Sequence, residues 1–159
     1  MAEKEFTHVD DRGAARMVDV SGKDVSVREA TATGAVLVST EVVALLRGAG
    51  VPKGDALAVA RIAGIQAAKR TPDLVPLCHP IAIHGVTVDL EVLDDRVAIS
   101  ATVRTADRTG VEMEALTCVS VAALALVDMV KAVDPAAVIT DVRVEEKLGG
   151  KTGVWRRPS

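Results

Sequence analysis

The chain has 159 residues, of which 49% are hydrophobic and 26% are charged, and these values are typical of one soluble globular domain. Aromatic residues make up only 1% of the chain, and the formal net charge is −3. Binding of single-stranded nucleic acid usually needs aromatic side chains in a positive groove, so this composition argues against a nucleic-acid partner. We expect one domain over residues 1–159, with flexible termini at about residues 1–14 and 154–159.

The cysteines and the apolar segments indicate a cytoplasmic protein. Cys78 and Cys118 are too few for a disulfide framework, and the charged N-terminal segment lacks the apolar core of a secretory signal. The longest uncharged apolar run, residues 115–127, is too short to cross a bilayer and has the length of a buried helix. We therefore expect reduced thiols and no membrane-spanning segment.

The first half of the chain predicts a strand followed by two helices. Residues 25–38 are rich in Val, Thr and Ala, which favours extended structure. A short helix is expected over residues 41–47, behind hydroxyl side chains that can serve as N-caps. A second helix is expected over residues 55–69, which Asp55 can cap and Pro72 can end.

The second half predicts a hairpin, a long helix and a last strand. Apolar and polar residues alternate over residues 86–92 and 97–103, with Asp94 and Asp95 as the turn between them. A long helix follows over residues 112–133, and alternation resumes over residues 138–145. The resulting order is that of an α+β, ferredoxin-like βαββαβ fold, an antiparallel sheet with helices packed on one face.

Charged residues mark both ends of the long helix, and each group has two interpretations. Asp128 and Lys131 are three residues apart, so they could form a surface ion pair or supply a carboxylate and an amine at the rim of a pocket. Glu112 and Glu114 flank Met113 at the start of the helix, where carboxylates favour the helix dipole. The same two acids could bind the N–H groups of a guanine-like ring.

The segment Leu77-Cys78-His79-Pro80, followed by His84, raises the question of a metal site. The spacing matches no structural zinc pattern and has no second cluster, so we expect no metal. His79 precedes a proline and is expected in an extended conformation, where it could act in hydrogen bonding or acid–base chemistry. Cys78 is expected to be buried rather than nucleophilic.

A glycine-rich loop follows the last predicted strand. Residues 147–153 superficially resemble a phosphate-binding P-loop, but the first required glycine would fall on Glu145 and too few residues follow to form the helix. The loop could present Lys147 and Lys151 to an anion, or it could be a mobile C-terminal segment.

Seven stretches, taken together and in order, resemble the cyclic pyranopterin monophosphate synthase (MoaC) family of molybdenum-cofactor biosynthesis. They extend from about Val18 to Gly153, and several long matching segments at family-like spacing are far more specific than one short motif. The stretches are MVDVS from Met17, KGD from Lys53, ARIAGIQAAKRT from Ala60, PLCHP from Pro76, TGVEMEALT from Thr109, DMVKAV from Asp128, and Lys147 with the GGK that follows.

The resemblance implies an activity and an assembly. Members of the family convert 3′,8-cyclo-7,8-dihydroguanosine triphosphate, which an upstream radical S-adenosylmethionine enzyme makes, into cyclic pyranopterin monophosphate with release of pyrophosphate. This would be a phosphorus–oxygen lyase that forms a cyclic phosphate. It implies no cofactor held by the protein, with Mg²⁺ on the substrate triphosphate as the exception, and a homohexamer built as a trimer of dimers with active sites between subunits.

The resemblance also implies roles for individual residues. It assigns as catalytic Asp128, Lys131, Lys53, Lys147 and His79. It assigns to substrate binding Leu77, Cys78, His79, Glu112, Met113 and Glu114. By charge, Lys53 and Lys147 would serve phosphate binding or proton transfer, and Asp128 would orient or deprotonate. His84 and Cys118 are given no function.

Two other classes of function share the predicted fold. A non-catalytic, oligomeric small-ligand-binding module is the alternative, since fold alone does not define function. Such a sensor would not need Asp128, Lys131, Lys53 and Lys147 together, whereas expulsion of pyrophosphate would. An RNA-recognition domain on the same plan would need aromatic residues on its sheet, which this chain lacks.

Overall fold

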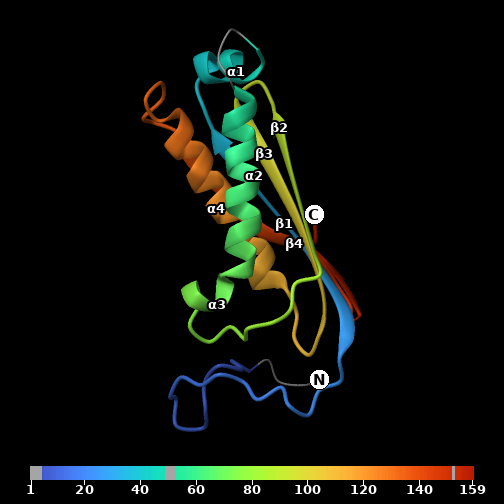
Figure 1. Ribbon diagram of the computed structural model, residues 1–159. Helices are drawn as coiled ribbons and strands as arrows, with labels where there is room; N and C mark the ends of the chain where they lie inside the picture. Colours follow the sequence, from blue (N-terminus) through green and yellow to red (C-terminus); the bar gives the residue numbers. More distant parts are fainter. Residues whose placement is uncertain (1–4, 49–52, 152) are drawn as a thin grey trace.

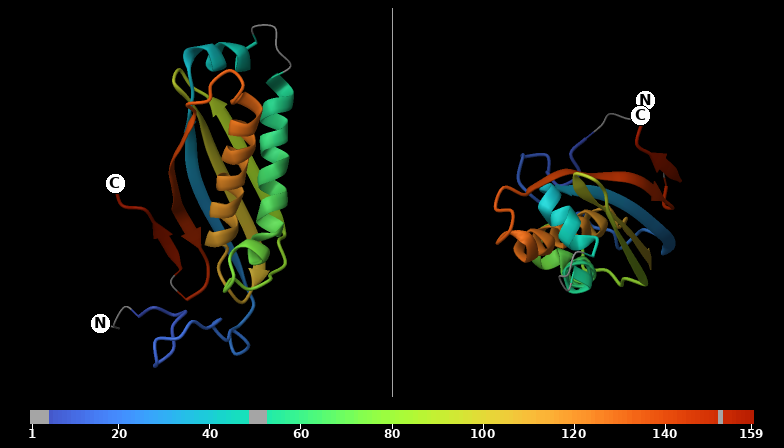
Figure 2. Two further views of the ribbon diagram at one scale, coloured as in Figure 1. Left: turned by 90° about the vertical axis from the view of Figure 1, so that its left-hand side faces the viewer. Right: turned by 90° about the horizontal axis from the view of Figure 1, so that it is seen from above.

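The computed structural model describes residues 5–48, 53–151 and 153–159, with only the backbone of residues 53 and 54. Within these residues, an antiparallel five-stranded sheet carries the helices on one face (Figures 1 and 2). The elements are β1 (Ser26–Leu37), α1 (Thr40–Leu46), α2 (Lys53–Lys69), α3 (Thr71–Leu74), β2 (Gly85–Val92), β3 (Arg96–Asp107), α4 (Glu112–Val130), β4 (Val138–Leu148) and β5 (Val154–Arg156). The strand order β2-β3-β1-β4-β5 confirms the predicted ferredoxin-like α+β arrangement, with β5 added at one edge.

The β2–β3 hairpin has the faces that its alternating sequence predicts. Val88 and Val97 are buried against the helices, and Asp89 and Glu91 are exposed. The two strands pair directly from Gly85↔Arg104 to Val92↔Val97. The predicted strand over residues 25–38 is likewise confirmed as β1, which pairs with β3 on one side and with β4 on the other.

The predicted helix boundaries need three corrections. α2 begins at Lys53, so Asp55 lies in its first turn and is not its N-cap. α2 ends at Lys69 as predicted, but Pro72 does not end it and instead occupies the first turn of α3, where the missing proline N–H costs no intrahelical bond. α4 ends at Val130 rather than at residue 133, and the N–H groups of Val133 and Asp134 both bond in turns to the Val130 carbonyl.

The predicted simple alternation in β4 is wrong, because β4 contains two bulges. Opposite β1, the pairing shifts between Thr33 and Ala35 and again between Thr31 and Ala32. At the first bulge Asp141 has a φ of 55°, and Ile139 and Val142 both pack on the core although they are three residues apart.

The second bulge decides the direction of Lys147. It leaves Lys147 opposite Ala30, a residue of β1 that is buried beneath the helices. Directly opposed residues of an antiparallel pair project from the same face, so Lys147 points to the helix side of the sheet.

Helix α4 is the centre of the core and packs between α2 and the sheet. A Cβ added at Gly64 of α2 would lie 2.9 Å from the Cys118 carbonyl oxygen, and one at Gly34 of β1 would lie 2.7 Å from Val119 Cγ1. These glycines therefore permit close approach on both sides of α4. By length and composition alone α4 could cross a membrane, but half of it is buried here in the manner of a core helix.

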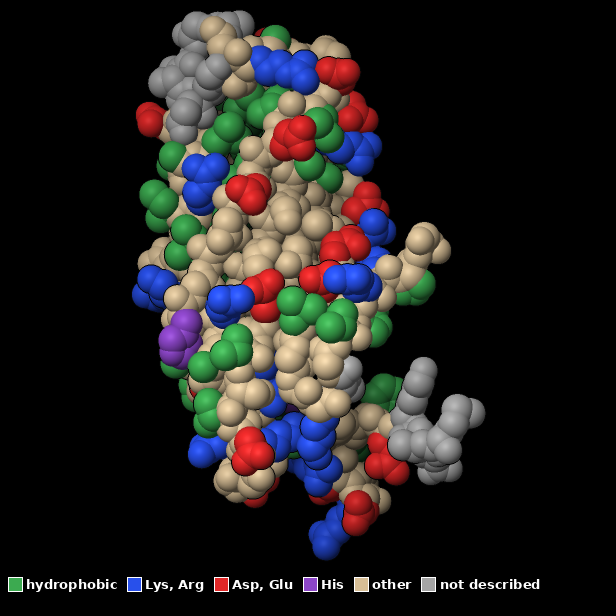
Figure 3. All heavy atoms as spheres, turned by 90° about the vertical axis from the view of Figure 1, so that its right-hand side faces the viewer, with side chains coloured by type: hydrophobic (Ala, Val, Ile, Leu, Met, Phe, Trp, Pro, Cys, Tyr) green, Lys and Arg blue, Asp and Glu red, His purple; other side chains and the backbone are tan. Residues whose placement is uncertain are grey.

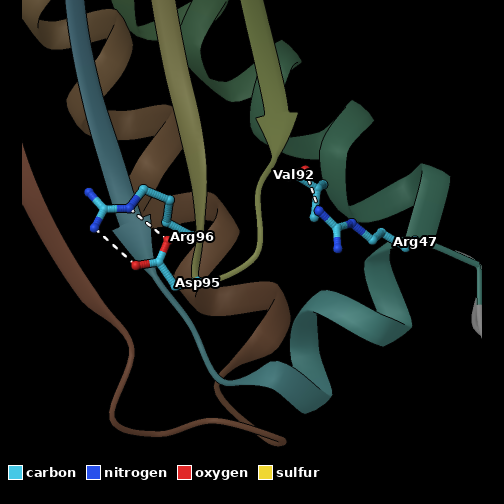
Figure 4. Close-up of polar contacts among 4 residues, drawn as sticks. All are labelled: Arg47, Val92, Asp95 and Arg96. Carbon is cyan, nitrogen blue, oxygen red and sulfur yellow. Dashed lines mark hydrogen bonds and ion pairs between the residues drawn. The ribbon is translucent and has the colours of Figure 1, made fainter.

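The two ends of the molecule differ in their elements. At one end, which we call the α1 end, α1 lies beside the start of α2 and the end of α4 (Figure 1). There Arg47 binds the Val92 carbonyl oxygen at 3.2 Å and Asp95 forms a two-point pair with Arg96 (Figure 4). At the other end, which we call the cavity end, the N-terminal segment passes below α3 and the start of α4 (Figures 1 and 2).

Candidate active site

A cavity of about 680 Å³ lies at the cavity end, among the N-terminal segment, the chain after α3 and the first turn of α4. Five of the predicted site residues line it, namely Leu77, Cys78, His79, Glu112 and Met113. The lining also includes His8 and Ala15 from the N-terminal segment. We call it the apolar cavity, and the structure thus brings together residues that are far apart in sequence.

Glu112 reaches this cavity because Gly110 leaves space for it. A Cβ on Gly110 would lie 2.5 Å from Glu112 Oε2 and 2.6 Å from Oε1, so a larger residue would displace the carboxylate. Val111 provides no side-chain N-cap for α4, and the Glu112 and Glu114 carboxylates lie in its first turn. Their charge is favourable at this end of the helix dipole, as the capping interpretation requires.

Cys78 is half-buried rather than buried as expected, and it contacts Glu114 at the wall of the cavity. Cys78 Sγ lies 3.5 Å from Glu114 Oε1, and Glu114 is 1% exposed. Glu114 Oε2 is buried and has no hydrogen-bond partner among the described residues. Burial raises the pKa of Glu114, and the charge of Glu112 acts in the same direction. The Cys78 thiol donates a hydrogen bond to Glu114 Oε1, and this contact acts in the opposite direction on the pKa of Glu114.

The Cys78 thiol is unsuited to nucleophilic attack. Burial, followed by the charge of Glu114, raises the pKa of Cys78 to about 12. A thiolate is the reactive form, so Cys78 remains a thiol at neutral pH. The geometry supports the expectation that Cys78 is not a nucleophile.

His79 is oriented by the N-terminal segment. Its Nε2 lies 2.5 Å from the carbonyl oxygen of Val18. Because a carbonyl oxygen can only accept, Nε2 carries the hydrogen and donates a hydrogen bond to that oxygen. This leaves Nδ1 as the ring atom that can accept a proton. The next residue, Asp19, accepts hydrogen bonds from Ser21, which lower the pKa of its carboxyl.

The groups considered for metal binding are occupied in other contacts. His84 Nδ1 accepts a hydrogen bond from the Ala106 N–H at 3.2 Å, and Cys78 is protonated. In the part of the chain that the structure describes, no group of three or more His, Cys, Asp or Glu residues could hold a metal ion. These donors do not fit a metal site, and the absence of a metal requirement stays a prediction.

Two further cavities adjoin the apolar cavity. A polar cavity of about 140 Å³ shares Gly110 and Glu112 with it and is also lined by Arg28 and Lys147. Lys147 Nζ lies 3.5 Å from Glu112 Oε1.

A basic cavity of about 500 Å³ then shares Arg28 with the polar cavity and is lined by Lys23 and Lys151. Figure 3 shows Lys and Arg side chains gathered at this end of the sheet face. Acidic residues also line these two cavities, Glu29 the polar one and Asp24 the basic one, so the series runs from an apolar part to a part where basic residues outnumber acidic ones.

The glycine loop after β4 packs directly on β1. Gly149 and Gly150 have φ values of 88° and 74°, in the region that side chains other than glycine rarely adopt. Added Cβ atoms would collide with the Val27 carbonyl oxygen and the Arg28 guanidinium, respectively. The loop thus brings its lysines to Arg28, and it does not form a P-loop.

Asp128 and Lys131 lie at the α1 end, away from these cavities. Lys131 Nζ lies 2.6 Å from Asp128 Oδ1, and the two side chains are 63% and 69% exposed, as in an ordinary surface pair. Asp128 follows Glu112 by about 16 residues of α4, which corresponds to about 24 Å along the helix axis. Within one chain, this pair cannot reach the apolar cavity. The side chain of Lys53 lies outside the described residues, although its backbone begins α2 at the same end.

Sequence reasoning missed Arg28, Lys23 and Val18 as parts of the site. Arg28 is a half-buried residue of β1, and nothing in the neighbouring sequence distinguishes it from the other arginines of the chain. Val18 acts through its carbonyl oxygen, so its side chain carries no signal. A pattern of basic residues spread over positions 23, 28, 147 and 151 becomes visible only when the β1–β4 pairing is known.

Comparisons with known proteins agree over nearly the whole chain. The sequence model of the MoaC family matches residues 17–150, which include every predicted site residue. A protein of Nocardioides sp. named cyclic pyranopterin monophosphate synthase is 73% identical over 158 residues, covering 98% of this chain and 97% of the relative. One of Streptomyces avermitilis is 72% identical over 156 residues, covering 98% and 92%. Cyclic pyranopterin monophosphate synthase 2 of Mycobacterium tuberculosis is 60% identical over 153 residues, covering 96% and 92%.

Proposed function

This chain belongs to the MoaC family, and we propose that it is a synthase that converts cyclised dihydro-GTP into cyclic pyranopterin monophosphate and pyrophosphate. The reaction closes a cyclic phosphate while a phosphorus–oxygen bond to pyrophosphate breaks, so the enzyme is a phosphorus–oxygen lyase. The observation that carries the proposal is the connected set of cavities, with carboxyl groups at one end and cations at the other.

The apolar cavity suits the purine-derived ring. Leu77 and Met113 offer apolar surface to the ring faces, and the Glu112 carboxylate can accept hydrogen bonds from ring N–H groups. Glu114 is buried behind this wall of the cavity, where its Oε1 accepts a hydrogen bond from the Cys78 thiol and supports the lining residues Cys78 and Met113.

The polar and basic cavities suit the triphosphate. Arg28 can form two parallel hydrogen bonds to one phosphate, and Lys147, Lys23 and Lys151 add point charges. Negative charge develops on the departing pyrophosphate, and cations placed beside it stabilise that charge. Lys147 is paired with Glu112 at the boundary between the ring and phosphate regions, where it can exchange this carboxylate for phosphate.

Proton transfer completes the reaction. His79 Nδ1 is the candidate acceptor within this cavity, because Nε2 is committed to Val18. We place Asp128 and Lys131 in the same site through a second copy of the chain, since they cannot reach the cavity of their own chain. Lys53, at the start of α2, would come with them. This arrangement agrees with a homohexamer of three dimers whose active sites lie between subunits.

The proposed reaction moves protons and phosphate without a redox step. It therefore needs no cofactor held by the protein, and Mg²⁺ can arrive with the substrate triphosphate. We propose a cytoplasmic enzyme that acts after the radical S-adenosylmethionine enzyme that supplies its substrate.

Incubation of the purified protein with cyclised dihydro-GTP tests the proposal. We expect pyrophosphate and cyclic pyranopterin monophosphate to appear in equal amounts, while GTP, which lacks the cyclised carbon skeleton, yields neither. Binding of the cyclised nucleotide without turnover would instead favour a non-catalytic ligand-binding module.

A further inference from the structure

The C-terminal strand β5 lies beyond the residues that the family model matches, and it is tied to the strand that carries Lys147. Arg156 Nε lies 2.7 Å from Glu146 Oε2. Arg157 donates its backbone N–H to the Glu145 carbonyl oxygen and its Nε–H to the Val144 carbonyl oxygen, both at 2.8 Å. These contacts close the base of the β4–β5 hairpin on the far side of the glycine loop.

Within this hairpin, Trp155 lies directly opposite Lys147. Opposed residues of an antiparallel pair project from the same face, and Lys147 points to the helix side, where it meets Glu112. The indole ring of Trp155 therefore lies on the same side as the methylene chain of Lys147. The ring is 37% exposed, and the Arg157 guanidinium lies over it at 5.8 Å from its centroid.

We propose that Trp155 is a positioning residue for Lys147. The ring, fixed by the β5 contacts and by Arg157, walls the edge of the sheet and restricts Lys147 to conformations that direct its ammonium group into the polar cavity. Without the ring, Lys147 samples solvent-directed conformations and loses part of its affinity for phosphate. This proposal rests on the proposed function, in which Lys147 binds the phosphate groups of the substrate.

Kinetics of Trp155→Ala test this role against a matched control. If Lys147 is no longer ordered in advance, binding must pay for ordering it, which corresponds to about a three- to tenfold weaker affinity. We therefore expect KM to rise by about that factor with kcat little changed. Trp155→Phe, which keeps an aromatic ring, should restore most of the affinity. Val154→Ala is the control, because Val154 is 61% exposed and pairs with Leu148 on the opposite face.

A double-mutant cycle shows whether Trp155 acts through Lys147. In the Lys147→Ala protein, the added Trp155→Ala change should have no further effect on KM. An equal rise in KM in both backgrounds would overturn the proposal, as would a Trp155→Ala protein that behaves like Val154→Ala. Circular dichroism and thermal melting identify any variant that fails to fold. If the Trp155 variants fail to fold, fluorescence of the wild type and of Lys147→Ala tests the coupling between Trp155 and Lys147.

The composition supplies this independent measurement, because Trp155 is the only Trp of the chain and there is no Tyr. Titration of the wild-type protein with pyrophosphate should change Trp155 fluorescence saturably, and Lys147→Ala should abolish that change. If pyrophosphate inhibits turnover but leaves the fluorescence unchanged, Trp155 is not coupled to Lys147 and the proposal fails. If the wild type shows no turnover, the proposed function fails, whereas the titration still decides whether Trp155 and Lys147 respond together to an anion.

Discussion

The cavity end and the α1 end both carry paired acidic and basic residues, but in opposite surroundings. At the cavity end, Glu114 is buried, Cys78 is desolvated, and Glu112 meets Lys147 between adjoining cavities. At the α1 end, Asp128 and Lys131 form a short pair that is mostly exposed. An exposed pair of this kind contributes little to stability. The proposed function gives the pair at the α1 end a role in the site of a second chain.

The same contrast explains why α4 is charged at both ends and apolar in its middle. One end enters the cavity of its own chain, and the other reaches the surface about 24 Å away. If a second chain brings its α1 end to the first chain's cavity end, both charged groups of α4 belong to active sites. If Asp128 and Lys131 form only a surface ion pair, their removal should leave turnover unchanged.

The largest effect is expected from Asp128→Ala and Lys131→Ala. Loss of a proton-transfer group should lower kcat by about a hundred- to ten-thousandfold. The free energy of unfolding should change by less than about 1 kcal/mol, because the pair is exposed. Steady-state kinetics and denaturant unfolding measure the two quantities.

A matched control lies at the same end. Arg47 and Asp94 form another exposed pair at 3.0 Å, so Arg47→Ala should retain normal turnover. Near-normal turnover of either Asp128→Ala or Lys131→Ala would show that the pair is only a surface ion pair.

A smaller effect is expected from Lys147→Ala at the cavity end. Removal of one charged hydrogen-bond donor to phosphate should raise KM by about ten- to a hundredfold. The wild-type KM should also rise with ionic strength, and this dependence should weaken in the variant. Lys69→Ala, an exposed lysine at the end of α2, is the control that should change neither quantity. A KM that ignores both salt and the Lys147 substitution would contradict the assignment of phosphate to this end.

Stability as a function of pH should also test the burial of Glu114 at the cavity end. Burial raises the pKa of Glu114 above its ordinary value of 4.5, so the folded state holds this proton more tightly than the unfolded state does. The stability associated with this proton is complete below pH 4.5 and is lost as pH rises through the folded-state pKa.

The variant Glu114→Gln cannot ionise and should escape that loss. We expect its melting temperature to exceed that of wild type above neutral pH, and the difference to shrink toward pH 4.5. A Glu114→Gln difference that does not vary with pH would contradict the burial argument.

The smallest effect is expected from metal removal. A chelator should leave kcat within about twofold, because Cys78 and His84 are engaged in other contacts and acid–base groups carry the proposed reaction. If the substrate triphosphate requires Mg²⁺, adding Mg²⁺ alone would restore the activity. Activity that is lost on chelation and recovered only with a transition metal would overturn this prediction.

Sequence patterns predicted the parts of the fold that follow simple periods. The β2–β3 hairpin was predictable because one face of it is buried and the other is exposed at every second residue. β4 was not, because its two bulges reverse the alternation without a composition signal, and one of them decides where Lys147 points. β5 was missed because three exposed residues at a sheet edge carry little apolar pattern.

Sequence patterns identified candidate site residues but not their geometry, and five of these candidates line the apolar cavity. The spacing of Asp128 and Lys131 left open a surface ion pair or a pocket rim, and in the structure the two side chains are paired at 2.6 Å. Helix-end spacing could not show that Glu114 would be buried against Cys78, because capping carboxylates are usually exposed. The predicted helix over residues 112–133 implied that its two charged ends lie far apart, but only the structure shows that just one of them lines the apolar cavity.

Mixing of two inactive proteins tests the shared site most directly. His79→Ala removes a side chain of the proposed pocket at the cavity end, and Asp128→Ala removes one at the α1 end. After dissociation and random reassembly of equal amounts, about one pocket in four should combine two intact halves, so we expect about a quarter of native activity. If verified mixed oligomers recover no activity, His79 and Asp128 do not meet across a subunit interface, and this account of the two ends is contradicted.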